Sequence, residues 1–108
     1  NRLHMLAAII SKVAKIDLSN MDIFLNVSEG YKLKTTMADV ACALAIISSY
    51  KCKSLAGNKV FIGELDLSGS IHLTSEAKKI IKVSDKSGFI PQLKARDLRD
   101  LIRFNFQG

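Results

Sequence analysis

Lysine side chains offer this chain its clearest chemistry. Lys78, Lys82 and Lys86 recur at every fourth position, so a helix would place their ammonium groups in one stripe, with Lys79 beside it. Like charges at this spacing repel by roughly a few tenths of a kcal/mol per pair unless an anion meets them. The stripe is equally consistent with phosphate contact and with an ordinary solvated face, and both interpretations stay open.

A second pair of lysines, Lys32 and Lys34, is separated by one residue. If residues 31–34 form a strand, the two side chains project from the same face. They then serve either as ligands for an anion or as charges that discourage pairing with another sheet edge.

The overall charge agrees with an anionic partner. The chain has 16 Lys and Arg against 10 Asp and Glu, a formal net charge of +6, and a pI near 9.5. This excess favours nucleic acid or anionic lipid as a partner. The longest apolar runs are too short and too interrupted to span a bilayer, so we expect no membrane-spanning segment.

Familiar catalytic and metal-binding patterns are not found in the sequence. It has no P-loop, no G-x-S-x-G and no G-x-G-x-x-G, and its acidic residues are scattered. His4 and His72 lack partners at zinc-site spacing. One helix cannot join Cys42 to Cys52, so we expect free thiols and a reducing compartment. Residue chemistry therefore predicts a binding or scaffolding module without metal, cofactor or small-molecule substrate.

One apolar helix organises the elements that must position these side chains. Residues 36–49 are rich in Ala and carry one charge, Asp39. This pattern predicts an N-cap at Thr36, an acidic first turn and burial on most sides. Helical spacing of apolar residues also predicts a first helix over residues 1–16.

Strands are expected on both sides of that helix. Alternation predicts a strand over residues 22–27. Residues 59–65 and 67–73 predict two more strands, joined as a hairpin or as a bent ribbon. Gly63 and Gly69 indicate a bulge or a close approach of the backbone within these strands.

Two more helices are expected before the end of the sequence. A cap at Thr74 or Ser75 begins the helix that carries the lysine stripe, and Gly88 ends it. A short extended piece follows, and then a helix over residues 94–104. The order predicts one α/β or α+β domain over residues 1–108, with a small mixed sheet flanked by helices.

Three segments carry a specific resemblance. Residues 22–49, 63–71 and 86–89 read DIFLNVSEGYKLKTTMADVACALAIISS, GELDLSGSI and KSGF. Their order and spacing resemble the C-terminal Lon-protease-like domain of the RadA (Sms) family of bacterial DNA-repair proteins. The opening residues 1–3, NRL, also resemble the start of that domain, so the resemblance covers nearly the whole chain.

The resemblance implies a ribosomal-protein-S5-domain-2-like fold, as in Lon peptidases, within a longer cytoplasmic bacterial protein. A first residue other than Met agrees with a fragment or a processed product. The expected parent carries a zinc motif and a RecA-type ATPase core, and acts as a hexameric motor in branch migration during recombination. ATP, Mg and Zn are therefore expected only in the parent, whereas this domain is expected to bind DNA and to scaffold the ring.

Relation to Lon peptidases bears on catalysis. Those enzymes use a Ser-Lys dyad, and the resemblance aligns Ala38 with the serine and Lys78 with the lysine. Because alanine provides no nucleophile, we expect no peptidase activity. The alternatives are a protein-interaction module without DNA affinity and, less favoured, an active Lon-type peptidase.

The resemblance and the basic pattern together give the candidate DNA contacts. These are Lys32, Lys34, His72, Lys78, Lys79, Lys82 and Lys86. Lys32 falls at a position that is commonly basic in the family, and His72 replaces an arginine with a weaker, pH-dependent charge. Other family positions also differ, at residues 29–30, 35–36, 69–72 and 80–84. The charged groups lost at these positions leave the contribution of this chain to a ring interface open.

Overall fold

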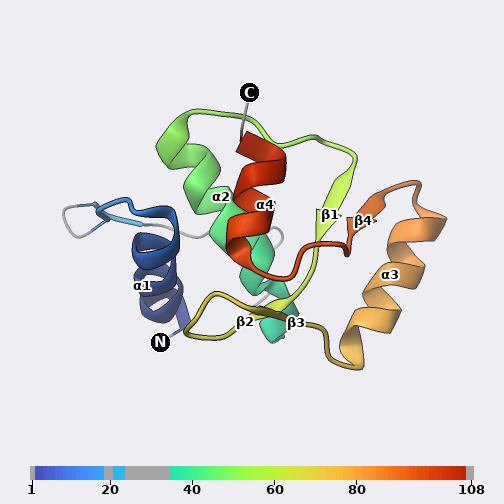
Figure 1. Ribbon diagram of the computed structural model, residues 1–108. Helices are drawn as coiled ribbons and strands as arrows, with labels where there is room; N and C mark the ends of the chain where they lie inside the picture. Colours follow the sequence, from blue (N-terminus) through green and yellow to red (C-terminus); the bar gives the residue numbers. More distant parts are fainter. Residues whose placement is uncertain (1, 19–20, 24–34, 107–108) are drawn as a thin grey trace.

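The computed structural model describes residues 2–18, 21–23 and 35–106 (Figure 1). The elements within these ranges are α1 (Arg2–Ala14), the 3-10 turn η2 (Thr36–Ala38), α2 (Asp39–Lys51), β1 (Lys59–Phe61), β2 (Glu64–Leu65), β3 (Ile71–His72), α3 (Glu76–Lys86), β4 (Ile90–Gln92) and α4 (Leu98–Phe106). This mixture of helices and short strands confirms the predicted α+β class.

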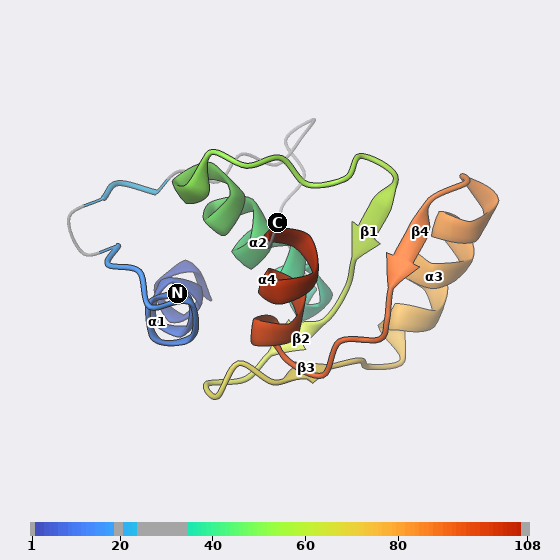
Figure 2. The ribbon, with the colours of Figure 1, turned by 45° about the horizontal axis from the view of Figure 1, so that its top comes forward.

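The strands form two separate pairs among the described residues, rather than the one mixed sheet that we expected. Strands β1 and β4 run parallel, with Lys59 opposite Ile90, and α3 lies in the connection between them. Strands β2 and β3 run antiparallel, with Glu64 opposite His72, so the hairpin is the correct one of the two expected connections. Helix α3 and β4 lie on the side of the molecule away from α1 (Figure 2).

The strand predicted over residues 59–65 is divided at Gly63. This glycine has a φ of +148°, and a Cβ atom there would lie 2.5 Å from Cγ2 of Ile71. Its N–H donates to the carbonyl of Met37 at 2.9 Å, and its carbonyl accepts from the N–H of Val40 at 3.1 Å. The predicted close approach is confirmed, and it ties the strand segment to the start of α2.

The strand predicted over residues 67–73 is shorter than expected. Only Ile71–His72 is a strand, because Asp66 folds the preceding residues into a turn. A Cβ atom on Gly69 would lie 2.9 Å from Cγ2 of Val13, so this turn packs closely on α1. The turn therefore links the hairpin to the helical side of the domain.

The chain enters α2 and α4 differently from the predictions. Thr35, not Thr36, caps η2, the turn that leads into α2, since Oγ1 of Thr35 accepts from the N–H of Met37 at 3.1 Å. Helix α2 itself follows Ala38 without a side-chain cap. Helix α4 begins at Leu98 rather than at residue 94. Its first turn is stabilised by Asp97, whose Oδ1 accepts from the N–H of Asp100 at 3.0 Å.

The predicted end of α3 at Gly88 is confirmed. The N–H of Gly88 donates to the carbonyl of Asp85 at 3.3 Å, and the N–H of Phe89 donates to that of Ser84 at 3.0 Å. This is the Schellman arrangement of a helix C-terminus. Helix α1 ends at Ala14, earlier than expected, where Lys15 has a φ of +56°.

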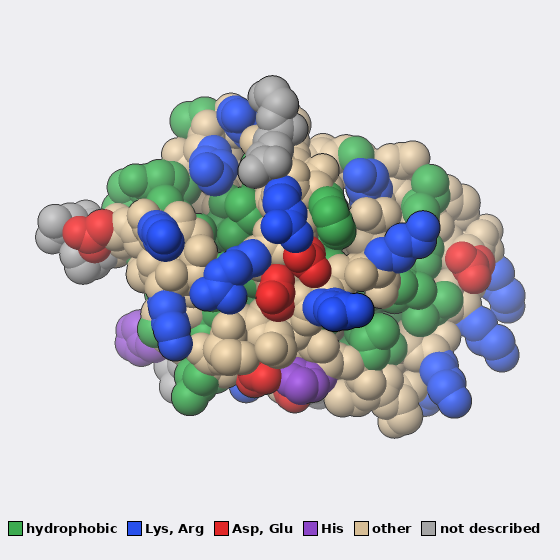
Figure 3. All heavy atoms as spheres, in the orientation of Figure 1, with side chains coloured by type: hydrophobic (Ala, Val, Ile, Leu, Met, Phe, Trp, Pro, Cys, Tyr) green, Lys and Arg blue, Asp and Glu red, His purple; other side chains and the backbone are tan. Residues whose placement is uncertain are grey.

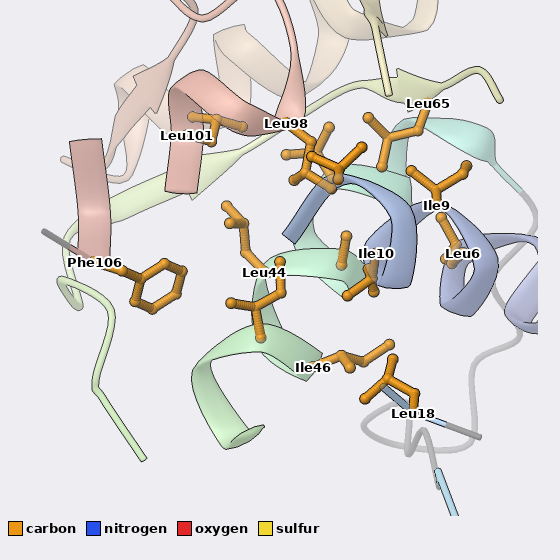
Figure 4. Packing of buried hydrophobic residues seen from close by; sticks show 14 residues of the cluster. Leu6, Ile9, Ile10, Leu18, Leu44, Ile46, Leu65, Leu98, Leu101 and Phe106 are labelled. Carbon is orange, nitrogen blue, oxygen red and sulfur yellow. The ribbon is translucent and has the colours of Figure 1, made fainter. Parts of the chain in front are cut away.

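The main core lies between α1, α2, α4 and the β2 strand (Figure 4). Its buried side chains are Leu6, Ile9, Ile10, Val13, Leu18, Val40, Ala43, Leu44, Ile46, Ile47, Leu65, Leu98, Leu101 and Phe106. Helix α2 is central, as predicted, but Ala41 and Ala45 are exposed, so it is not buried all round. A smaller cluster of Met37, Ile62 and Ala77 lies against α3.

The strand predicted over residues 22–27 lies, from residue 24 on, outside the described residues. Asp22 and Ile23 are described and do not belong to a strand. The strand predicted over residues 31–34 also lies outside. No helix within the described ranges is long and apolar enough to cross a membrane.

Candidate nucleic-acid interface

Helix α3 positions the lysine stripe. Its inner side is defined by Ala77 and Ser84, which are buried, and the Ser84 hydroxyl donates to the carbonyl of Ile80 at 2.8 Å. The first turn is supported by Thr74, whose Oγ1 accepts from the N–H of Glu76 at 3.3 Å. The outer side carries four exposed lysines, Lys78, Lys79, Lys82 and Lys86.

The four lysines of α3 are free to meet an external anion. None of them forms an ion pair within 4.0 Å among the residues that the structure describes. Glu76 and Asp85 are the acids of this helix, so positive charge is in excess. Lys and Arg side chains gather over α3 at the right-hand edge of the surface view (Figure 3). A phosphate can approach these ammonium groups without first displacing a carboxylate.

His72 lies on the preceding hairpin, where an acid contacts it. Its Nε2 is 2.7 Å from Oδ2 of Asp66, and the imidazole is about half exposed. The Ser68 hydroxyl donates to Oδ1 of the same carboxylate at 2.6 Å. The Ser68 hydroxyl, and next the His72 ring, hold the pKa of Asp66 well below its usual range. Any anion at His72 therefore also meets a carboxylate.

The structure thus brings together part of the predicted set. The α3 lysines share one helix, and His72 lies on a separate element with its own partner. Lys32 and Lys34 lie outside the described residues. Their predicted role is not addressed by the geometry.

The position aligned with the Lon serine lies where η2 meets α2. Ala38 ends η2, and the next residue, Asp39, is only 3% exposed. Its Oδ1 accepts from Nε of Arg2 at 2.9 Å, and its Oδ2 accepts from Nη2 of Arg2 and from the N–H of Leu65 at 3.0 Å. The bond to Asp39 raises the pKa of the Arg2 guanidinium. This carboxylate is fully used in joining α1, α2 and β2.

Sequence reasoning missed the structural role of this pair. It treated Asp39 only as an acid of the first helical turn. The available signal was that Asp39 is the single charge in an otherwise apolar stretch. Such a charge is costly to bury unless a partner neutralises it.

The two cysteines are free, as predicted. Burial raises the pKa of the half-buried Cys42 thiol, and the negative charge of Asp39 adds to this. Cys52 is exposed. Among the described residues no group of three or more metal-ligating side chains is found.

A further surface feature was not anticipated. Val83 of α3 and Phe89 and Ile90 of the following segment are 64%, 44% and 52% exposed. Val83 falls among lysines on the outer part of the helix, and Phe89 directly follows the glycine that ends it. Both residues are apolar and neither belongs to a predicted core, so the sequence could have indicated an exposed apolar surface here.

Comparison with known proteins identifies the family. Residues 2–93 match the family described as subunit ChlI of Mg-chelatase, and the chain belongs to this family. Several relatives of the chain are named as DNA repair proteins. The chain is 37% identical over 102 residues to DNA repair protein RadA of Campylobacter jejuni, which covers 91% of this chain and 23% of that protein.

Other relatives carry the same name. Identity is 33% over 111 residues to DNA repair protein RadA of Chlamydia pneumoniae, covering 99% of this chain and 24% of that protein. It is 36% over 98 residues to that of Aquifex aeolicus, covering 91% and 22%. The chain therefore spans less than a quarter of the length of these relatives. The resemblance to the RadA family that the sequence predicted is confirmed.

Proposed function

We propose that this chain is a non-catalytic domain of a RadA-like DNA repair protein, and that it binds DNA and supports assembly of the subunits. Its similarity to proteins named DNA repair protein RadA supports the assignment to repair. The observation that carries DNA binding is the set of four exposed α3 lysines without ion-pair partners among the described residues. Phosphate contacts of this kind supply affinity without reading the base sequence.

The proposal includes the setting of the domain. ATP, Mg and Zn would belong to the remainder of a longer, cytoplasmic parent protein, whose hexameric motor drives branch migration. The fold would be of the ribosomal-protein-S5-domain-2-like, Lon-type class. An experimental structure of the chain that superimposes on a Lon peptidase domain supports this class, and a different strand order contradicts it.

The proposal also excludes peptidase activity. Residue 38 is alanine, and the neighbouring Asp39 carboxylate is occupied by Arg2 and by the backbone of Leu65. Neither group can form an acyl-enzyme. Incubation with an unfolded protein substrate should give no cleavage, and turnover that Lys78→Ala abolishes would contradict the proposal.

Salt-dependent binding to a short labelled DNA duplex tests the lysine assignment. Fluorescence anisotropy between about 50 and 200 mM salt gives the slope of log K against log salt concentration. The triple variant Lys78→Gln/Lys82→Gln/Lys86→Gln should bind more weakly, and its slope should be smaller by about 3 if each lysine meets one phosphate.

A matched control separates local contact from net charge. Lys12→Gln/Lys15→Gln/Lys51→Gln removes three exposed charges outside α3. Both triple variants lower the formal net charge from +6 to +3. Equal loss of affinity and slope in the two variants would contradict an interface on α3.

The second candidate function is a protein-interaction module without DNA affinity. The exposed Val83, Phe89 and Ile90 favour it, because apolar side chains gathered on one surface mark association sites. Light scattering with and without the duplex, at low and moderate salt, separates the two. Gain of mass with DNA at low salt supports the first function, whereas self-association that ignores DNA supports the second.

A further inference from the structure

An open groove lies along the flank of α3 that carries Lys79, next to the stripe of Lys78, Lys82 and Lys86. It has a volume of about 420 Å³, and its apolar lining comes from two strand regions and the helix. Its lining includes the apolar side chains of Val60, Ile80, Val83 and Phe89, together with Lys79 and Ser87. We name it the α3–β4 groove.

We propose that the α3–β4 groove binds an acidic segment of a partner protein, which inserts aliphatic or aromatic side chains between α3 and Phe89. This binding site goes beyond the proposed DNA contact. It uses the apolar side chains of Val83 and Phe89, which the DNA assignment does not use, although Lys79 belongs to both sets.

The shape and lining of the groove favour a peptide side chain. Val83 is 64% exposed and Phe89 is 44% exposed, yet both line a concavity instead of standing singly on a convex surface. Apolar concave sites with a few polar groups at the edge are typical of ligand recognition. Hydrophobic side chains (green) also gather near α3 in the surface view (Figure 3).

Charge complementarity selects the class of partner. Lys79 lines the groove, and Lys82 and Lys86 are exposed on the same helix. None of the three has an acidic partner within 4.0 Å in the described part of the chain. Asp or Glu residues that flank an inserted apolar side chain would meet these ammonium groups, which steers association and sets its orientation.

A second copy of the chain that docks through the same face fits the groove less well. Each copy has a net charge of +6, and a two-fold contact through α3 would place this basic helix against itself. Like charges across an interface oppose association. DNA phosphates would match the lysines but would leave Val83 and Phe89 without apolar partners.

Selection from a random peptide library displayed on phage, with the full 108-residue chain as bait, tests the proposal. The enriched peptides should share at least one aromatic or aliphatic residue flanked by Asp or Glu. The strongest of them is then synthesised with a fluorescent label, and its affinity is measured by anisotropy. Val83→Asp should weaken it by about tenfold or more, because it places a like charge and a polar group in the groove.

The matched control is Leu67→Asp. Leu67 is 69% exposed in the β2–β3 turn and does not line the groove, so its replacement should leave peptide affinity within about twofold. Both sites are exposed, so both variants should fold, and circular dichroism checks this. Absence of an acidic and apolar consensus, or equal loss in the two variants, overturns the proposal.

Duplex binding by the same variants distinguishes this site from the DNA surface. If Val83→Asp weakens DNA binding as much as peptide binding, the groove belongs to a nucleic-acid interface and the peptide proposal is overturned. If the triple α3 lysine variant keeps full DNA affinity while Val83→Asp loses the peptide, the groove proposal stands and the DNA assignment fails.

Discussion

The two sides of this domain use their apolar residues differently. On one side, α1, α2 and α4 bury theirs in the main core, where Ile10, Leu44 and Ile47 are fully enclosed. On the other side, α3 packs against β4 and contributes Ala77 to the small cluster with Met37 and Ile62. The first side supplies most of the folding stability, because stability follows buried apolar area.

Their charged groups differ in the same way. Asp39 is enclosed and fully bonded by Arg2 and Leu65, whereas the lysines of α3 point to solvent without acidic partners among the described residues. One region uses charge to join its own elements. The other leaves charge and apolar surface exposed to solvent.

The largest expected effect comes from truncating an apolar side chain on each side. Leu44→Ala should lower the free energy of unfolding by about 3 kcal/mol, since Leu44 is 0% exposed and a cavity remains. Ile80→Ala, beneath the half-covered α3, should cost about 1 kcal/mol. Urea denaturation measures both. Equal costs would remove the contrast between the two regions.

Removing the charge of the enclosed acid should have the next largest effect. Asp39→Asn leaves Arg2 with only the longer contact to Glu64 at 3.9 Å and weakens the bond from the Leu65 N–H, so the cost should be about 2 kcal/mol. The Arg2 side chain is 43% exposed, so solvent screens its charge and reduces this loss of stability. The control Asp85→Asn on α3 should change stability by less than about 0.5 kcal/mol.

The β2–β3 turn should respond to acid through Asp66. Because the pKa of Asp66 is depressed in the folded chain, its stabilising effect is present above its ordinary pKa of about 3.9. That effect is lost as the pH falls through the lower, folded-state pKa. The shift of the Ser68 and Ser70 amide NMR signals that reports protonation of Asp66 should therefore appear only below about pH 4.

Asp66→Asn is the control for that titration. It removes the titrating carboxylate and should abolish the acid-dependent shift of the same two amides. A shift centred near the ordinary Asp pKa of about 3.9 in the unmodified chain would show that the hydroxyl and imidazole bonds do not stabilise the carboxylate.

The smallest expected effect is a difference in reactivity between the thiols of Cys42, beside the core, and Cys52, on the surface. Cys52 is exposed, whereas Cys42 is half buried and burial raises its pKa, so it holds less thiolate at a given pH. A disulfide reagent at about pH 8 should modify one thiol rapidly and one slowly. Cys52→Ser should eliminate the rapid phase, and its persistence would contradict this assignment of the thiols.

Local patterns account for the correct predictions. Helices α1 to α4, the β2–β3 hairpin and the end of α3 at Gly88 follow from periodicity and from residues that cap or stop helices. The exposure of the α3 lysines follows for the same reason. The predicted first and last residues of the helices were less accurate. Asp97 caps α4, but it is one of several acids at which this helix could begin.

The sequence by itself determined the family, the central apolar helix and the helix that presents the lysines, because each is encoded in neighbouring residues. The tertiary structure alone decided the break at Gly63, the α3–β4 groove and the pairing of Arg2 with Asp39. That pair joins residues 37 positions apart. Such contacts depend on how helices and strands pack against one another, and short-range periodicity carries no record of that packing.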